Sequence, residues 1–298
     1  MAKVQELGYV GVSSGDLDAW RSFAPTVLGH EIAHDTDADT LFLKMDDHHH
    51  RLTIHAGEAD DVAYVGWTVA DAPTVHAIAA QLDACGVTVT AATPERAADR
   101  RVLDFVHFTD PHSGVRMEIH YGPEVTFVPP FLPQRPITGF KTDRVGLGHF
   151  VTFVPDVAAA AEFYDRALGF HVSDWIVVPG MGRIGAFLHC NRRHHSLAIF
   201  ANPAPRKHVH HVMMEYQSLD DVGSAYDLCL ERDLVTATLG RHLNDHMVSY
   251  YFKNPGDWHF ELGWGAREID PETWQVQHYN GLQPGGGEWG HSGLLGVM

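Results

Sequence analysis

The chain is poor in cysteine and in basic residues. Its 298 residues include three cysteines, Cys85, Cys190 and Cys229, which lie far apart and form no CxxC pair. This excludes a disulfide framework and a zinc-finger spacing, and it predicts a reducing, cytoplasmic location. Lys and Arg number 21 against 38 Asp and Glu, a formal net charge of −17, and no basic run exceeds two residues. That balance argues against a nucleic-acid partner and against an anionic membrane surface.

Long apolar runs are also absent. No apolar stretch approaches the roughly 20 residues that a membrane-spanning helix needs, and the N-terminal segment lacks the charged and apolar regions of a secretory signal. We therefore expect neither a membrane span nor secretion. Apolar residues still make up 45% of the chain, which is enough to bury a core in each of two domains of ordinary size.

An internal repeat organises the chain. Residues 147–170 match residues 7–30 without a gap, as LGHFVTFVPDVAAAAEFYDRALGF against LGYVGVSSGDLDAWRSFAPTVLGH. Each copy predicts a strand, at 6–13 and at 146–154, followed by a helix with regularly spaced apolar residues. An aspartate stands at each expected helix N-cap and a glycine at each C-cap, namely Asp16 and Gly29, then Asp156 and Gly169.

The strand–helix–strand pattern then restarts within each half. The expected elements are strands at 40–45, 51–55, 62–69, 102–108, 115–121, 184–190, 195–200, 210–218, 246–252 and 258–263, and helices at 72–85 and 219–232. This indicates an α+β fold of four βαβββ modules in two tandem domains, 1–135 and 136–298. The Pro- and Gly-rich segment 122–143 reads as a linker, and the Gly-rich tail after 264 is expected to be irregular.

Histidine is abundant, with 23 residues, and the two halves use it differently. The second half has His149, His211 and Glu261 at strand positions where the first half has Tyr9, Tyr64 and Glu118. Two imidazoles and one carboxylate on one face of a metal leave its opposite face open to substrate and O2. A single buried His is more often a hydrogen-bonded core residue. Three such residues on corresponding strands, in one half alone, predict a metal centre there.

The remaining histidines are expected to be structural. His48, His49 and His50 lie in a polar turn, where a solvated loop is the favoured interpretation. We interpret His189, His194, His208 and His210 as structural or as supporting the metal site, and we expect His112, His120 and His259 at the surface.

Several strings resemble the type I extradiol ring-cleavage dioxygenases, specifically the 2,3-dihydroxybiphenyl 1,2-dioxygenase group. They are LHCNRRHHSLA at 188–198, HHVMMEY at 210–216, TLGRHLNDHMVSYYFKNP at 238–255 and FELGWG at 260–265. The resemblance covers 5–292. It implies the vicinal-oxygen-chelate, or glyoxalase-like, fold, which has the four-module architecture that the repeat already indicates.

The resemblance also implies an activity and a set of site residues. The activity is extradiol cleavage of a catechol, aryl-substituted or bicyclic as in 2,3-dihydroxybiphenyl, with both atoms of O2 inserted. The metal ligands would be His149, His211 and Glu261, the acid/base residue His195, the groups that hydrogen-bond the substrate oxygens His242 and Tyr251, and the pocket and loop residues Phe187, Asn244 and Asp245. The metal would be Fe(II), although Mn(II) fits the same ligands, and the assembly a homo-oligomer, often an octamer.

The sequence departs from the family pattern at two positions, and two alternative functions are considered. Tyr250 replaces the usual aliphatic residue or Phe, and Asp257 stands where the family has Gly or Pro. Both lie near the strand that bears Glu261 and could alter substrate range.

One alternative function is that of a glyoxalase-like metal-dependent lyase or epimerase. Tyr9 and Tyr64 argue against it, because such enzymes take metal ligands from both repeated modules. The other is a metal-free small-molecule binding module.

Overall fold

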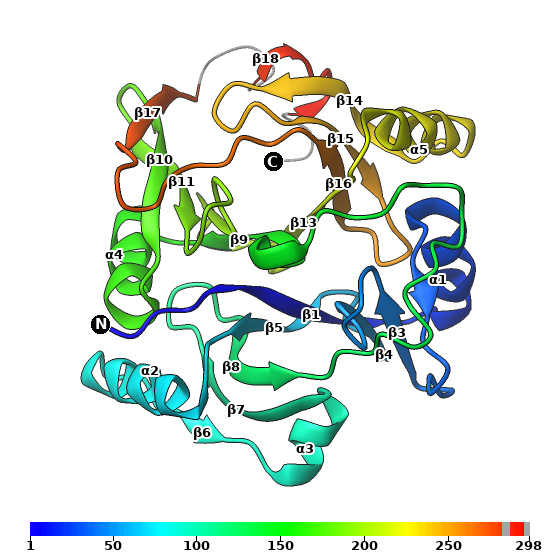
Figure 1. Cartoon of the computed structure of the whole chain (residues 1–298). Helices are drawn as coiled ribbons and strands as arrows, with labels where there is room; N and C mark the ends of the chain where they lie inside the picture. The colour runs from blue at the N-terminus through cyan, green and yellow to red at the C-terminus, as the bar shows by residue number, and fades with distance from the viewer. Residues whose placement is uncertain (282–286, 295–298) are drawn as a thin grey trace.

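Two large sheets, one from each half of the sequence, make up the fold (Figure 1). The computed structural model describes residues 1–281 and 287–294. The first half contributes β1 (Glu6–Ser14), α1 (Leu17–Phe23), η1 (Ala24–Leu28), β2 (Glu31–Ile32), β3 (Thr40–Lys44), β4 (Leu52–Ala56), β5 (Val62–Thr68), α2 (Ala72–Ala84), β6 (Thr90–Ala91), α3 (Pro94–Asp99), β7 (Val102–Thr109) and β8 (Arg116–Pro123). Its strands pair in the order β2-β3-β4-β1-β5-β8-β7-β6.

The second half repeats this plan and extends it. After η2 (Asp143–Val145) come β9 (Gly148–Val154), α4 (Val157–Leu168), β10 (His171–Val178), β11 (Gly182–His189), β12 (Leu197–Ala201), β13 (Val209–Glu215), α5 (Leu219–Glu231), β14 (Val235–His242), β15 (Val248–Lys253), β16 (His259–Trp264), β17 (Gln277–Asn280) and β18 (Gly287–Gly290). The order is β17-β10-β11-β12-β9-β13-β16-β15-β14-β18. In both sheets the first strand of each module runs parallel to its last strand, and the two first strands pair antiparallel. The predicted α+β architecture of βαβββ modules is confirmed.

The repeated helix begins as the sequence predicts in both halves but ends differently. The Asp16 carboxylate accepts a hydrogen bond from the Ala19 N–H, and Asp156 caps α4 in the same way. Both closing glycines are left-handed, with φ of 82° at Gly29 and 74° at Gly169. Pro25 has no N–H to continue the α-helical ladder, so the first copy ends in the π turn η1.

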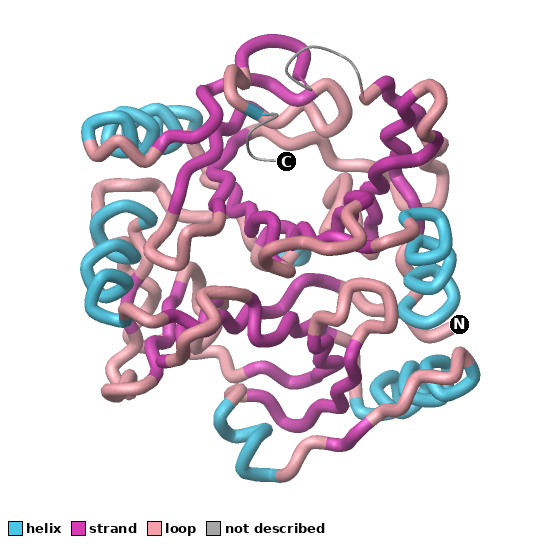
Figure 2. Tube along the Cα trace, turned by 180° about the vertical axis from the view of Figure 1, so that it is seen from behind, coloured by secondary structure: helices cyan, strands magenta, loops and turns pink. Residues whose placement is uncertain are grey.

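The two halves share one continuous apolar core. Helix α2 packs against α4 (Figures 1 and 2), and η1 packs against α5, so each such contact joins elements from different halves. The Gln81 side chain bridges them by donating to the carbonyls of Ala2 and Ala167. Segment 124–142 contains no helix or strand and crosses to α5, where the Thr138 N–H donates to Asp221. None of the described helices is long and apolar enough to span a membrane. The domain boundary at 135/136 stays a prediction.

Some sequence-based expectations are wrong. The tail after 264 was expected to be irregular, but β17 pairs with β10 and β18 pairs with β14, at opposite edges of the second sheet. His120 is fully buried rather than at the surface, and its Nε2 lies 3.2 Å from Thr68 Oγ1. His50 is buried too, because its ring packs against Phe42 beneath the turn. The residues next to a histidine in the sequence do not show which other elements of the fold will bury it.

Buried histidines of the first half should make the fold sensitive to acid. Burial lowers the pKa of His30 to about 3, and its ring stacks on Phe140 at 5.1 Å. The folded-state pKa lies below the unfolded one, so stability is complete above about pH 6.5 and is lost as the pH falls toward 3. Between pH 7 and 5 this group should cost about 2 kcal/mol of stability.

The measurement is urea unfolding of the wild type and of His30→Phe at pH 7 and at pH 5. The difference between the two proteins cancels the contribution of the other titrating groups. We expect the variant to lose about 2 kcal/mol less than the wild type over this interval. Equal losses of stability in the two proteins would show that folding does not lower the pKa of His30.

Candidate metal centre and substrate pocket

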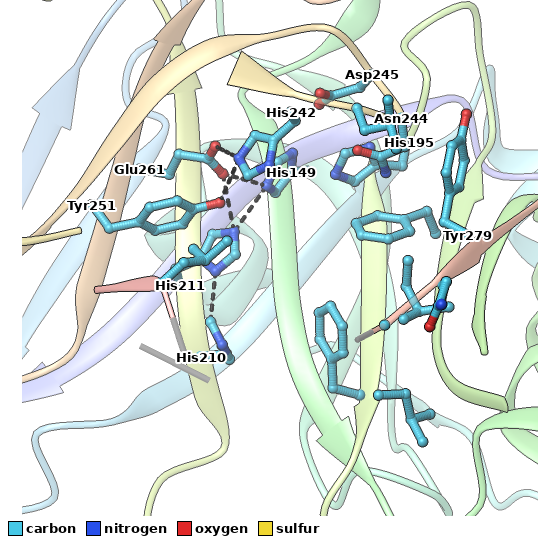
Figure 3. A pocket seen from close by; sticks show the side chains of 18 residues that line it. His149, His195, His210, His211, His242, Asn244, Asp245, Tyr251, Glu261 and Tyr279 are labelled. Carbon is cyan, nitrogen blue, oxygen red and sulfur yellow. Dashed lines mark hydrogen bonds and ion pairs between the residues drawn. The ribbon is translucent and has the colours of Figure 1, made fainter. Parts of the chain in front are cut away.

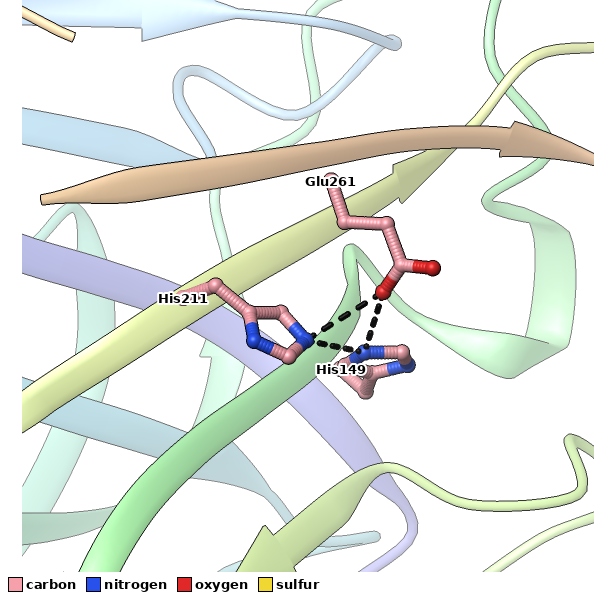
Figure 4. A group of neighbouring side chains, drawn as sticks. All are labelled: His149, His211 and Glu261. Atoms are coloured by element: carbon pink, nitrogen blue, oxygen red, sulfur yellow. Dashed lines mark hydrogen bonds and ion pairs between the residues drawn. The ribbon is translucent and has the colours of Figure 1, made fainter. Parts of the chain in front are cut away.

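Three neighbouring strands at the middle of the second sheet bring the predicted ligands together. His149 on β9 is paired with Met213 on β13, and Met213 is paired with Glu261 on β16. Paired residues of adjacent strands project to the same face, and so does His211, two residues before Met213. The three side chains therefore meet on one face of the sheet, as Figure 4 shows.

The distances within this group suit a metal ion. Glu261 Oε2 lies 3.2 Å from His149 Nε2 and 3.2 Å from His211 Nε2, and the two nitrogens are 3.0 Å apart. Metal bonds of about 2.1 Å at right angles place ligand atoms about 3.0 Å from one another. Among the described residues no other group of His, Cys, Asp and Glu was found that could hold a metal. The residues present thus fit one face of a six-coordinate cation.

Glu261 is held so that only one of its oxygens, Oε2, faces His149 and His211. Its Oε1 accepts a hydrogen bond of 2.6 Å from the Ser249 hydroxyl and lies 3.1 Å from His242 Nε2. Burial alone would raise the pKa of Glu261, but hydrogen bonds with His149, His211 and His242 hold it well below its usual range. The carboxylate is therefore charged, and its Oε2 is the oxygen that could bind a metal together with the two histidines. Burial lowers the pKa of His211 to about 4, so its imidazole is neutral and able to bind a metal.

His195 lies beside the cluster and faces the same pocket. Its ring stacks on His149 with a centroid distance of 4.1 Å, and it packs against Phe187 at a steep angle of 73° with centroids 4.7 Å apart. Burial, with contributions from His149 and His194, holds the pKa of His195 well below its usual value. Its imidazole is therefore neutral near pH 7 and able to accept a proton.

Tyr251 and His242 cover the opposite side of the cluster. The Tyr251 hydroxyl lies 2.9 Å from His242 Nε2, and the tyrosine ring meets His211 edge-on. Burial and the neighbouring Glu261 raise the pKa of Tyr251 well above its usual value, so it remains a neutral donor. His242 is stacked on His291 of the C-terminal tail, with ring centroids 4.2 Å apart.

All of the predicted site residues line one pocket (Figure 3), with an empty volume of about 960 Å³ that includes space open to solvent. Asn244 and Asp245 lie in the turn after β14, which is fixed by the Asp245 carboxylate accepting from the Met247 N–H and by the Arg267 N–H donating to the Asp245 carbonyl. The apolar side chains that line the pocket are Ile176, Ile184, Phe187, Phe200, Leu243 and Leu294, and Tyr279 and Asn280 line it as well.

Sequence reasoning missed the part of the pocket that the tail supplies. Tyr279 and Leu294 line it because β17 and β18 return to the two edges of the sheet. It also missed β14, whose last residue is His242, although the string LGRH marked this residue. Ile176 on β10 also lines the pocket, whereas Met181 in the turn after β10 is 74% exposed.

In the first half, Tyr9 and Glu118 occupy the positions that correspond to His149 and Glu261. Tyr9 pairs with Gly66 and Gly66 pairs with Glu118, the same register as His149, Met213 and Glu261. The Tyr9 hydroxyl donates to Glu118 at 2.8 Å, and Arg100 donates to the same carboxylate at 2.9 Å. The Arg100 guanidinium also lies 3.6 Å above the Tyr64 ring. Arg100 thus supplies the positive charge beside Glu118 that a metal ion would supply beside Glu261. The first half therefore has no equivalent set of metal ligands.

Paired βαβββ modules around such a cluster define a protein of the vicinal-oxygen-chelate superfamily. Accordingly, residues 146–262 match the glyoxalase/bleomycin resistance protein/dioxygenase superfamily, and residues 7–57 match the dihydroxybiphenyl dioxygenase BphC D1 family. The biphenyl-2,3-diol 1,2-dioxygenase of Paraburkholderia xenovorans is 42% identical over 98% of this chain and 96% of its own. The 1,2-dihydroxynaphthalene dioxygenase of Sphingobium xenophagum is 42% identical over 90% of this chain and 91% of its own.

A solved structure agrees with these relatives. A catechol 2,3-dioxygenase superposes with a TM-score of 0.89 at 40% identity, covering 98% of this chain and 96% of that one. The chain belongs to the extradiol ring-cleavage dioxygenases, in the group that includes the biphenyl-2,3-diol 1,2-dioxygenases. It is therefore an enzyme that incorporates O2 into a catechol, and membership in this family implies a catalytic metal.

Proposed function

We propose that the chain cleaves an apolar, aryl-substituted or bicyclic catechol such as 2,3-dihydroxybiphenyl, and that Fe(II) held by His149, His211 and Glu261 is its cofactor. The observation that carries this proposal is the position of the three ligand atoms in a pocket whose lining is otherwise mainly apolar. The family relationship supports ring cleavage over the lyase and the metal-free binding alternatives.

The ligand set suits Fe(II), and Mn(II) fits it as well. When bound, the ion would hold catechol and O2 together and would pass electrons from one to the other. Two neutral imidazoles and one carboxylate leave a divalent site with a net charge of about +1, which favours binding of a catecholate anion. Elemental analysis of protein purified from cells supplied with both metals would distinguish the two ions.

Three side chains of this protein handle protons around the substrate. His195, neutral and facing the pocket, accepts a proton at its Nε2 atom and returns it as the ring opens. Tyr251 donates a hydrogen bond to a substrate oxygen, and His242, 2.9 Å from the tyrosine hydroxyl, orients it. Asn244 and Asp245, fixed by the turn after β14, line the pocket with His242.

The charge of the pocket wall limits which catechols fit. No Lys or Arg side chain is among the described residues that line it, and its carboxylates are Asp245 and Glu261. A substrate carboxylate would therefore be desolvated without a cationic partner, which is costly. A second aromatic ring would instead contact the apolar wall formed by Ile176, Ile184 and Phe200.

We expect kcat/KM for 2,3-dihydroxybiphenyl to exceed that for unsubstituted catechol by about 30-fold, because burying roughly 80 Å² of a second ring at about 25 cal/mol per Å² contributes about 2 kcal/mol. The value for 3,4-dihydroxyphenylacetate should be lower again by about 100-fold or more. The measurement is O2 uptake together with the absorbance of the yellow ring-opened product. The variant Ile184→Ala should lower the biphenyl-to-catechol ratio several-fold. Equal constants for all three diols would contradict the assignment of the apolar wall.

We further propose a homo-oligomer, as the family relationship suggests, and a cytoplasmic location, as the three unpaired cysteines suggest. An octamer is the assembly expected for this group. Light scattering of the purified enzyme tests the assembly, and a molar mass equal to the 33.0 kDa chain would contradict it.

A further inference from the structure

The buried carboxylate of Asp174 is linked to His195 through one intervening residue, His194. Asp174 on β10 and His194 on the loop before β12 are 0% and 1% exposed, and His194 Nε2 lies 2.9 Å from Asp174 Oδ2. On its other side His194 Nδ1 lies 3.1 Å from His195 Nδ1. The three residues therefore form a chain, Asp174–His194–His195, that ends at the ring facing the substrate.

The order of protons along this chain follows from the donor and acceptor capacity of each atom. A carboxylate oxygen can only accept, and neither the Asp174 oxygens nor His194 Nε2 has another hydrogen-bond partner among the described residues, so the 2.9 Å contact between them is the pairing open to both. The proton of a neutral His194 must therefore lie on Nε2, which leaves a lone pair on its Nδ1. The atom that faces this lone pair, His195 Nδ1, must then carry a proton. The Nε2 atom of His195 is left with its lone pair free to accept.

The surroundings hold the middle ring in place. The indole of Trp274 meets His194 edge-on, with centroids 5.6 Å apart at 88°, and its Nε1 donates to the Ser173 carbonyl at 3.0 Å. The Ser173 hydroxyl donates in turn to the His194 carbonyl. His194 can therefore neither rotate its ring nor move its backbone away from His195 without breaking these contacts.

We propose that Asp174 and His194 are positioning residues that fix His195 as the Nδ1–H tautomer, with its Nε2 lone pair directed at the substrate. Without this chain His195 could carry its proton on either nitrogen, and the Nε2–H form cannot act as a base. The inference rests on the proposed role of His195 in ring cleavage. It adds two residues that touch neither substrate nor metal ligands.

The first half contains a similar but more exposed arrangement, which supplies a control. His49 Nε2 lies 3.0 Å from Asp35, and His49 Nδ1 lies 3.0 Å from His50 Nδ1. His49 and His50 precede β4 just as His194 and His195 precede β12. In that half Tyr9 occupies the position of His149, so the chain ends at no ligand set. Replacing its middle residue should leave turnover intact.

The kinetic test compares two substitutions of the middle residue. His194→Phe keeps the ring volume beside Trp274 but removes the acceptor, whereas His194→Asn places an amide oxygen near the position of Nδ1. With 2,3-dihydroxybiphenyl we expect His194→Phe to lower kcat about 100-fold with KM changed less than 3-fold, and His194→Asn to recover most of that loss. Asp174→Asn should lower kcat about 10-fold. The control His49→Phe should stay within about 2-fold of the wild type.

A second readout does not depend on turnover. Neutron diffraction from crystals of the full-length, iron-loaded enzyme in D2O, kept anaerobic, locates the deuterium on each imidazole. We expect deuterium on His195 Nδ1 and on His194 Nε2, and none on His194 Nδ1. Deuterium on His194 Nδ1, or full kcat in His194→Phe, would overturn the proposal. If the wild type cleaves none of the three diols, the proposed function fails while the diffraction result still decides the tautomer.

Discussion

Replacing Glu261 with alanine should leave the enzyme without bound iron and lower kcat/KM by more than about 1,000-fold. The carboxylate supplies the one negative charge of the proposed ligand set, and its Oε2 lies 3.2 Å from both histidine nitrogens. Its loss leaves two neutral imidazoles, which hold a divalent ion weakly. The measurement is iron content per chain after gel filtration, together with activity before and after adding Fe(II) under anaerobic conditions.

The first half of the chain provides the control for this experiment. Glu118 occupies the register position of Glu261 but is paired with Arg100 and Arg116. Glu118→Gln should therefore keep one iron per chain and close to full activity, even where its stability is lower. Two equivalents of iron in the wild type, or loss of iron in Glu118→Gln, would contradict the single-site interpretation.

The sequence predicted the metal centre because the repeat served as an internal reference. His149 and Tyr9 align without a gap, so the chemical difference between the halves was visible against a shared strand and helix. The pairing of neighbouring strands then relates further positions of the two halves to one another. Met213 is paired with both His149 and Glu261, and Gly66 with both Tyr9 and Glu118. Local patterns that recur in both halves fix the fold strongly, and so they could be read from one chain.

The parts that were missed depend on contacts between distant segments. Strand β17 follows β10 by about a hundred residues and consists of QHYN, which has no alternation of apolar and polar residues. Its pairing with β10 brings Tyr279 to the pocket, and no local pattern specifies this. The burial of His120 likewise depends on Thr68 and on the stacked ring of Tyr9, from two other strands. Such side chains take their roles from the tertiary structure.

Asp257 and Tyr250 depart from the family pattern without touching the pocket. Asp257 lies in the turn between β15 and β16 and forms an ion pair of 2.6 Å with Lys253. It has a positive φ of 53°, a conformation that favours Gly and tolerates Asp better than most other residues. Tyr250 points into the core, where its hydroxyl lies 3.5 Å from the Cys229 sulfur. Neither residue lines the pocket, so we expect neither to set the substrate range.

The variant His195→Ala should behave in the opposite way to Glu261→Ala, retaining iron and catechol but losing turnover. His195 stacks on His149 and lines the pocket, yet it lies outside the ligand group. Removing a positioned acid/base group costs about 100- to 10,000-fold in kcat. Single-turnover kinetics with 2,3-dihydroxybiphenyl would measure this loss, and anaerobic titration with the same diol would show that binding is retained.

Chemical rescue separates a lost proton acceptor from a lost packing contact. The alanine variant leaves a cavity between His149 and Phe187, the two rings that contact His195 in the wild type. Added imidazole should enter from the open pocket and restore kcat by about 10-fold or more, because it supplies a free base at the vacated position. A similarly shaped molecule without a basic nitrogen, such as pyrrole, should restore none of it. Equal rescue by both would assign His195 a structural role, and undiminished turnover in His195→Ala would exclude it as the base.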